Sequence, residues 1–105
     1  MTSRHRRGDV YWAHLDPTVG TEINKSRPVL ILSPDDMNDA IPRVIIAPMT
    51  TKGRPMGSRP DVVFKGKRAK ILLDQIRTVD KSRLTIKMGS IDQKIWLPTL
   101  LEMFA

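Results

Sequence analysis

The sequence predicts a mainly β protein with short helices, folded as a small antiparallel barrel or curled sheet that ends in a helix. Several short runs of β-branched and aromatic residues follow one another closely, with turn residues between them. The last apolar run, from Ile91 to Phe104, has a partly helical spacing instead. The chain has 105 residues, 40% of them apolar, so we expect residues 1–105 to form one domain around one core.

The first two predicted strands flank a long polar loop. Residues 10–15 are rich in aromatic and β-branched side chains, and residues 28–32 form the second strand. Because Val29–Leu32 is continuously apolar, we expect the second strand to be buried on both faces. The loop over residues 16–26 is too long for a tight hairpin turn. Arg27 therefore lies where a loop meets a strand, which suits anion recognition; the alternative is an ordinary surface arginine.

A short helix and a third strand are predicted next. Residues 34–40 contain acids that favour the start of a helix, and Ser33 is the expected N-cap. Residues 43–49 are mostly valine and isoleucine, which predicts a strand. Pro48 has no N–H to donate, so we expect that end of the strand to be an edge or a bulge.

The second half of the chain begins with a long loop. Residues 50–60 are polar and basic and lack apolar periodicity, so we expect a mobile loop. Asp80 is the expected cap of a turn or short helix over residues 80–83. Pro98 either kinks a terminal helix or lies in its first turn, and both remain open. The remaining strands are predicted over residues 61–64, 69–73, 76–79 and 84–88.

The positive charge is concentrated in one segment. The formal net charge is +7, and residues 43–70 carry eight basic side chains against the single acid Asp61. The rest of the chain holds as many acids as bases. Such a field attracts polyanions, which here are nucleic acid, an acidic membrane surface or an acidic protein partner. The alternative is a solvated basic loop that aids solubility.

Several classes of chemistry find no support in the sequence. The chain has no cysteine, which excludes disulfides and thiolate metal sites and is compatible with a reducing cytoplasm. Its two histidines are isolated, and the acids at residues 35, 36 and 39 are better explained as a helix start than as a metal site. Residues 1–8 are expected to be a mobile basic arm without a signal peptide, and no apolar run is long enough to span a bilayer.

A sparse set of polar residues is left at the predicted strand ends. Together with a basic loop, these groups can bind and polarise a phosphodiester. RNA can cleave itself when its 2′-hydroxyl attacks the adjacent phosphate, so a protein needs only to align the attack, stabilise the phosphoryl charge and manage two protons. This chemistry requires no metal. The residues in question are Glu22, Arg27, Thr50, Thr51, Asp74 and Gln75.

Three ordered blocks of the sequence resemble one family. The first joins Gly-Asp-Val-Tyr-Trp-Ala from Gly8, Gly-x-Glu up to Glu22, and Ser-Arg-Pro-Val-Leu-Ile-Leu-Ser from Ser26. The second is Pro-Met-Thr-Thr up to Thr51, and the third is Leu-Asp-Gln-Ile-Arg-Thr-Val-Asp from Leu73. Together they resemble the MazF/PemK toxins, which are sequence-selective, ribosome-independent endoribonucleases of bacterial toxin–antitoxin systems.

The resemblance implies an SH3-like β-barrel of the CcdB/MazF type with a C-terminal helix. It also implies a cytoplasmic homodimer that binds single-stranded RNA in a groove, uses no cofactor or metal, and is neutralised by a cognate antitoxin. Arg27 and Thr50 are the implied catalytic pair. Glu22 and Asp74 are the implied further catalytic acids, although Leu72 stands where some members have an arginine. The implied RNA contacts are Thr51, Lys52, Arg54, Arg59 and Gln75.

Two other functions stay open on the same barrel. One is a non-enzymatic toxin that resembles CcdB and poisons DNA gyrase through protein contacts. The other is an inactive RNA-binding barrel. The presence of Arg27 and Thr50 at the family's positions favours the nuclease, because gyrase poisons do not need that pair.

Overall fold

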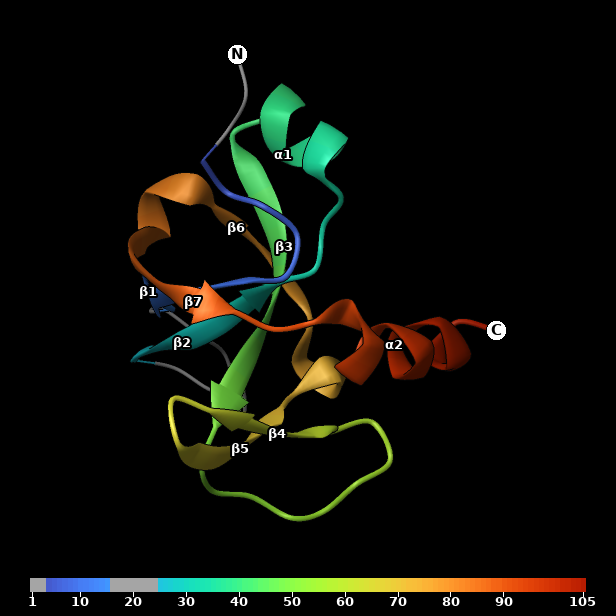
Figure 1. The fold of residues 1–105 in the computed structure, drawn as a ribbon. Coiled ribbons are helices and arrows are strands. Elements are labelled where there is room, and N and C mark those ends of the chain that lie inside the picture. The colour runs from blue at the N-terminus through green and yellow to red at the C-terminus, as the bar shows by residue number, and fades with distance from the viewer. Residues whose placement is uncertain (1–3, 16–24) are drawn as a thin grey trace.

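The computed structural model describes residues 4–15 and 25–105, in which seven antiparallel strands curl into an open barrel (Figure 1). The sheet order is β4-β5-β3-β2-β1-β7, and β6 pairs with β3 beside this path. This arrangement confirms the predicted fold class. The strands are β1 (Asp9–His14), β2 (Ser26–Ile31), β3 (Arg43–Thr50), β4 (Asp61–Phe64), β5 (Lys67–Ile71), β6 (Arg77–Asp80) and β7 (Leu84–Ser90).

Short helices connect the strands and end the chain. α1 (Asp35–Ala40) links β2 to β3, and α2 (Leu97–Met103) projects away from the sheet at the C-terminus (Figure 1). Pro98 lies at the second position of α2, so the helix starts late and is not kinked there. Three 3₁₀ turns complete the fold: η1 (Leu73–Gln75), η2 (Lys81–Arg83) and η3 (Gln93–Ile95).

Two caps were predicted, and one is present. The Asp80 carboxylate accepts a hydrogen bond from the Ser82 N–H at 2.9 Å at the start of η2, as expected. The Ser33 prediction is wrong, because Pro34 precedes α1 and no side chain caps it. The Ser33 hydroxyl instead donates to the buried Asn38 side chain at 2.6 Å and accepts from the Ile45 N–H at 3.0 Å. The Ser33 hydroxyl therefore connects α1 to β3 through these two hydrogen bonds.

β3 is the central strand, and it changes partners along its length. It pairs with β2 on one side; on the other it pairs first with β6 and then, at Met49 and Thr50, with β5. Pro48 lies where this second side changes partner, and its carbonyl accepts from the Leu72 N–H at 2.9 Å. The missing N–H of Pro48 faces the same side, since N–H and C=O of one strand residue point together. Of the two predicted alternatives for this end of the strand, an edge or a bulge, the edge is therefore wrong.

The core lies on both sides of β2, as its apolar run predicted. Val29 and Ile31 join one buried cluster, whereas Leu30 and Leu32 join the other. All four side chains are at most 3% exposed. Because alternate residues of a strand point to opposite faces, β2 holds two apolar layers at once.

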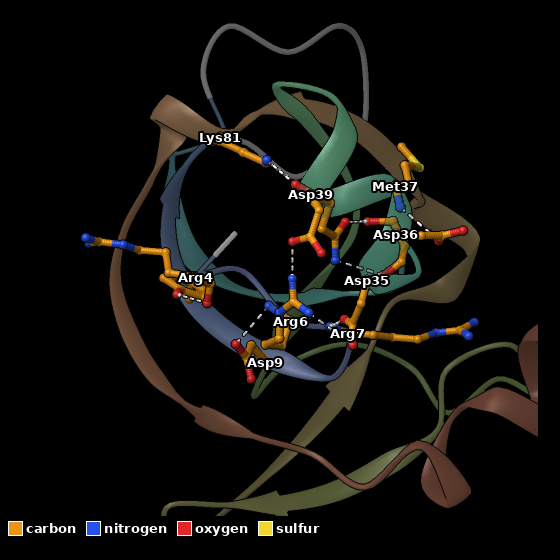
Figure 2. A network of polar contacts seen from close by, with 12 residues as sticks. Arg4, Arg6, Arg7, Asp9, Asp35, Asp36, Met37, Asp39 and Lys81 are labelled. Atoms are coloured by element: carbon orange, nitrogen blue, oxygen red, sulfur yellow. Dashed lines mark hydrogen bonds and ion pairs between the residues drawn. The ribbon is translucent and has the colours of Figure 1, made fainter. Parts of the chain in front are cut away.

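The N-terminal segment is fastened to the barrel (Figure 2). Arg6 forms ion pairs with Asp39 and, at 3.5 Å, with Asp35 of α1, and the Arg7 N–H donates to Asp35 at 2.7 Å. We expected a mobile arm over residues 1–8; this is wrong for residues 4–8, and residues 1–3 lie outside the described part. Asp35 at the start of α1 and Asp39 near its end thus bind the Arg6 side chain. In residues 4–15 and 25–105, no helix combines the length and apolar character that a membrane span requires.

Candidate active site

The register of β2 and β3 brings Arg27 and Thr50 together. Val29 pairs with Pro48, and the same register continued by two residues sets Arg27 opposite Thr50. Opposed residues on antiparallel strands project to the same face of the sheet. β2 begins at Ser26, so Arg27 is the second residue of the strand and is fixed by the ladder; we had expected it at the junction with the loop.

The two side chains are in hydrogen-bond contact. Arg27 Nη1 donates to Thr50 Oγ1 at 3.4 Å, a long bond that leaves room for tightening around a ligand. The same hydroxyl accepts from the Lys52 N–H at 3.1 Å, which fixes the start of the loop after β3. Arg27 Nε is buried and has no hydrogen-bond partner among the described residues. A guanidinium has five N–H donors, so the bond to Thr50 leaves other donors with which Arg27 can bind an anion.

An open cavity of about 470 Å³ surrounds this pair. That volume falls in the range of about 300–1,000 Å³ common for ligand sites. Its described lining contains three cationic side chains, several apolar ones and no carboxylate. The lining residues are Trp12, Ser26, Arg27, Pro28, Met49, Thr50, Thr51, Phe64, Lys65, Lys67, Ala69 and Met88.

Asp74 and Arg59 form a separate ion pair. Arg59 Nε and Nη2 each donate to one Asp74 carboxylate oxygen at 2.9 Å. The hydrogen bonding to Arg59 holds the pKa of Asp74 below its usual value of 3.8. Neither residue lines the cavity around Arg27 and Thr50. The structure thus groups two of the four predicted catalytic residues and sets Asp74 apart.

The other predicted site residues fall into three places. Glu22 lies outside the described residues. Thr51 lines the cavity, whereas Lys52 and Arg54 are exposed on the loop after β3. Gln75 ends η1, directly after Asp74.

Sequence reasoning missed the aromatic and basic wall of the cavity. Trp12 of β1 is 37% exposed although its neighbours Tyr11 and Ala13 are buried, and Phe64 ends β4. Lys65 lies in the turn between β4 and β5, and Lys67 is the first residue of β5. Two signals in the sequence could have found this wall. One is Trp12, a large aromatic residue at an outward position of a strand, and the other is Phe64, which Lys65 and Lys67 follow closely.

The arrangement fits recognition of a phosphodiester. A guanidinium can stabilise charge that develops on phosphoryl oxygens, and a threonine hydroxyl can hydrogen-bond a phosphate oxygen or a ribose hydroxyl. The positions of both groups are set by backbone ladders, so little reorganisation accompanies the reaction.

The sequence profile of one family, described as a "PemK-like, MazF-like toxin of type II toxin-antitoxin system", matches residues 6–98. The chain belongs to this toxin family. The three blocks that suggested MazF/PemK toxins all lie within the match, so the resemblance is confirmed.

Relatives and solved structures agree with this family. Endoribonuclease EndoA of Bacillus subtilis is 40% identical over 96 residues, which cover 86% of this chain and 83% of EndoA. Endoribonuclease MazF of Staphylococcus saprophyticus is 39% identical over 95 residues, covering 85% of this chain and 79% of that protein. A MazF crystal structure from Deinococcus radiodurans superposes with a TM-score of 0.83 at 21% identity, covering 95% of this chain and 96% of that one. This last likeness concerns the fold alone.

Proposed function

We propose that this chain is a sequence-selective endoribonuclease toxin that cleaves single-stranded RNA and is inhibited by a cognate protein antitoxin. The observation that carries the proposal is the contact of Arg27 with Thr50 in an open, cationic cavity. Membership of a type II toxin family and two relatives named endoribonucleases support it. We further propose that it acts in the cytoplasm as one domain.

The proposed reaction uses the RNA as its own nucleophile. The 2′-oxygen attacks the adjacent phosphorus and loses its proton, the bond from phosphorus to the 5′-oxygen breaks, and the leaving 5′-oxygen takes up a proton. Arg27 binds the phosphoryl oxygens and stabilises the charge of the transition state, while Thr50 orients the phosphate or the attacking hydroxyl. Arg27 does not serve as the base, because a guanidinium stays protonated. No metal is required by this scheme.

Two acids are proposed for proton transfer, Glu22 and Asp74. Asp74 is tied to Arg59 and has a lowered pKa, which makes it a weak base in the free protein. Its role as a proton acceptor therefore requires that RNA phosphates draw Arg59 away from it. If Asp74 instead acts only through the ion pair, Asp74→Asn and Arg59→Ala should lower the rate equally.

We propose a homodimer as the working unit. At the C-terminal end of the chain, Leu101 is 63% exposed and Phe104 is 74% exposed. These side chains form apolar surface that a second copy of the chain can cover. The further proposed RNA contacts are Thr51 in the cavity, Lys52 and Arg54 on the loop after β3, and Gln75 of η1. Light scattering should give twice the 11.9 kDa mass of one chain.

The deciding experiment incubates the purified protein with a long defined transcript in the presence of EDTA. Cutting at a short recurrent sequence supports the proposal and its independence from metal. Cutting only after magnesium is restored would contradict metal independence but not the nuclease. Intact RNA together with inhibited DNA gyrase would favour a gyrase poison, and RNA that is retained but uncut would favour a binding protein.

Matched variants connect cleavage to the site. Arg27→Ala and Thr50→Ala should each slow cutting by about 10²-fold or more while circular dichroism reports an unchanged fold. Arg43→Ala and Thr78→Ala are the controls, because both residues are exposed on β3 and β6 and do not line the cavity. Equal loss in the controls would contradict the assignment.

A further inference from the structure

The cavity contains an apolar wall that the cleavage chemistry does not use. Trp12 and Phe64 line it, with Met49, Ala69 and Met88 beside them. Trp12 is 37% exposed, in contrast to the fully buried Trp96 of the core. An exposed tryptophan in the cavity that also contains Arg27 leaves a flat apolar surface in contact with water, and such surfaces commonly bind ligands.

The position of Phe64 is fixed by contact with β7. A Cβ built on Gly89 would lie 3.2 Å from two atoms of the Phe64 ring, so a glycine at this position lets the ring approach the strand. This approach brings together β4 and β7, the two ends of the strand order, and both Phe64 and Met88 of β7 line the cavity. Phe64 is therefore a fixed wall, which suits stacking better than a freely rotating side chain does.

Two lysines stand next to this wall. Lys65 and Gly66 form the two-residue turn between β4 and β5, both with positive φ (51° and 78°), and Lys65 and Lys67 line the cavity. Lys70 of the same hairpin is bound to Asp61 at 2.5 Å. Within the described part of the chain, by contrast, Lys65 and Lys67 make no ion pair. Their charges are available to an anionic ligand.

From this geometry, and on the basis of the proposed nuclease function, we propose that the cavity binds one unstacked RNA base against Trp12 and Phe64. Lys65 and Lys67 bind the phosphate on one side of that base. The linkage that is cleaved at Arg27 lies on the other side of the base. The ligand is an RNA segment because the lining combines aromatic faces with cations and lacks a carboxylate among its described residues. Single-stranded RNA is recognised in this way, by stacking of splayed bases on aromatic side chains and by phosphate contacts.

This path differs from the one that the family resemblance implies. The resemblance assigned phosphate contacts to the loop residues Lys52, Arg54 and Arg59. Arg59 is held by Asp74, and none of the three lines the cavity. The cations that line the cavity beside Arg27 are instead Lys65 and Lys67 of the β4–β5 hairpin.

The first test needs no variant. A short RNA with one mapped cut site is synthesised with a single abasic ribose at each position near the cut in turn. Stacking is worth about 1–3 kcal/mol per base, so removal of the bound base should lower kcat/KM by about 5- to 150-fold at one position. If every abasic RNA is cut as fast as the intact one, the proposed base site is wrong. If the intact RNA is not cut at all, the proposed function fails instead.

The second test assigns the effect to Trp12. Trp12→Ala should lower kcat/KM on intact RNA by the same factor. The abasic substitution should then cause no further fall in the kcat/KM of this variant, because the two changes remove one interaction. Trp12→Phe should restore part of the activity. Ile86→Ala is the control, since Ile86 pairs with Trp12 across β1 and β7, is 67% exposed and does not line the cavity. Fully additive losses in the cycle would overturn the proposal.

The third test concerns the lysines and the competing ligand. Lys65→Gln and Lys67→Gln should each reduce the slope of log affinity against log salt by about 0.7, whereas Lys94→Gln should not change it. An unchanged slope in both variants would overturn the phosphate contact. If Trp12→Ala cuts RNA normally but binds the antitoxin more weakly, the cavity is a peptide site and the proposal is wrong.

Discussion

Arg59 holds Asp74 through two parallel hydrogen bonds of 2.9 Å, although the two residues belong to different segments of the chain. This fork is the geometry in which arginine binds carboxylates most strongly. It connects the loop after β3 to η1, and it pairs Asp74, an implied catalytic acid, with Arg59, an implied RNA contact. Its consequences for stability can be measured separately from catalysis.

The pH dependence of stability should reveal this pair. Hydrogen bonding to Arg59 lowers the pKa of Asp74 in the folded state, so its stabilisation is present above the usual value of 3.8 and is lost as the pH falls through the folded-state pKa. The side chains of Arg59 and Asp74 are only 18% and 28% exposed. Asp74→Asn should therefore lower the free energy of unfolding by about 1 kcal/mol at pH 7, and by less near pH 2. Urea titrations at both pH values measure this difference, with Glu102→Gln as the control; a loss that is independent of pH would contradict it.

Arg27→Lys should separate charge from geometry. Lysine keeps the positive charge but loses the planar fork, so one or more donors to the phosphoryl oxygens are missing in the transition state. Loss of one such donor typically lowers kcat by about 10²- to 10³-fold. Single-turnover cleavage of a mapped RNA measures the rate, and Arg43→Lys is the matched control. A variant that lost only affinity, with kcat unchanged, would place Arg27 in binding rather than in catalysis.

At Thr50 the hydroxyl should matter more than the methyl group. Thr50→Val keeps the shape but removes the acceptor for Arg27 and for the Lys52 N–H, so kcat should fall by about 10²-fold. Thr50→Ser keeps the hydroxyl and should retain activity within about tenfold. The same single-turnover assay compares them, with Thr78→Val as a control. Equal activity of the valine and serine variants would exclude the hydroxyl from the reaction.

The N-terminal attachment should contribute to stability but not to activity. Arg6 binds Asp35 and Asp39 of α1, and Arg6→Ala should lower the free energy of unfolding by roughly 1 kcal/mol. Arg4→Ala is the control, because the described contact of Arg4 is a backbone carbonyl that accepts from Tyr11 Oη at 3.3 Å. Urea unfolding at low salt and at 1 M salt measures the free energy of unfolding of both variants. High salt should reduce the loss that Arg6→Ala causes, because it screens the ion pairs. A loss of RNA cleavage in folded Arg6→Ala would contradict a purely structural role.

Features governed by local chemistry could be predicted from the sequence. The run Val29–Leu32 is buried on both faces, Asp80 caps η2, and β4 covers residues 61–64 as expected. Pro98 constrained the start of α2 to a neighbouring residue. In each of these cases the cause lies within a few residues of the element, so periodicity and backbone sterics suffice.

Features that depend on distant partners could not be predicted. Ser33 has the right residue type for a cap, but it forms its bonds with Asn38 and Ile45 instead. Pro48 lacks an N–H, yet it lies inside the sheet because β3 changes partner there. The pairing of Arg27 with Thr50 was implied only by the resemblance, since no spacing rule predicts the register that places them together. The Arg59 fork depends on the path of a loop without regular secondary structure.

The β2–β3 register has one more consequence. Backbone hydrogen bonds, rather than the surrounding loops, set the separation of Arg27 and Thr50, whereas Trp12, Phe64 and the hairpin lysines belong to other strands and turns. The pair proposed to cleave RNA and the surface proposed to bind a base are therefore carried by different elements of the fold. Substitutions in the β4–β5 hairpin and on the outer face of β1 can therefore tune the affinity for RNA while the two central strands, and the contact that they hold, stay unchanged.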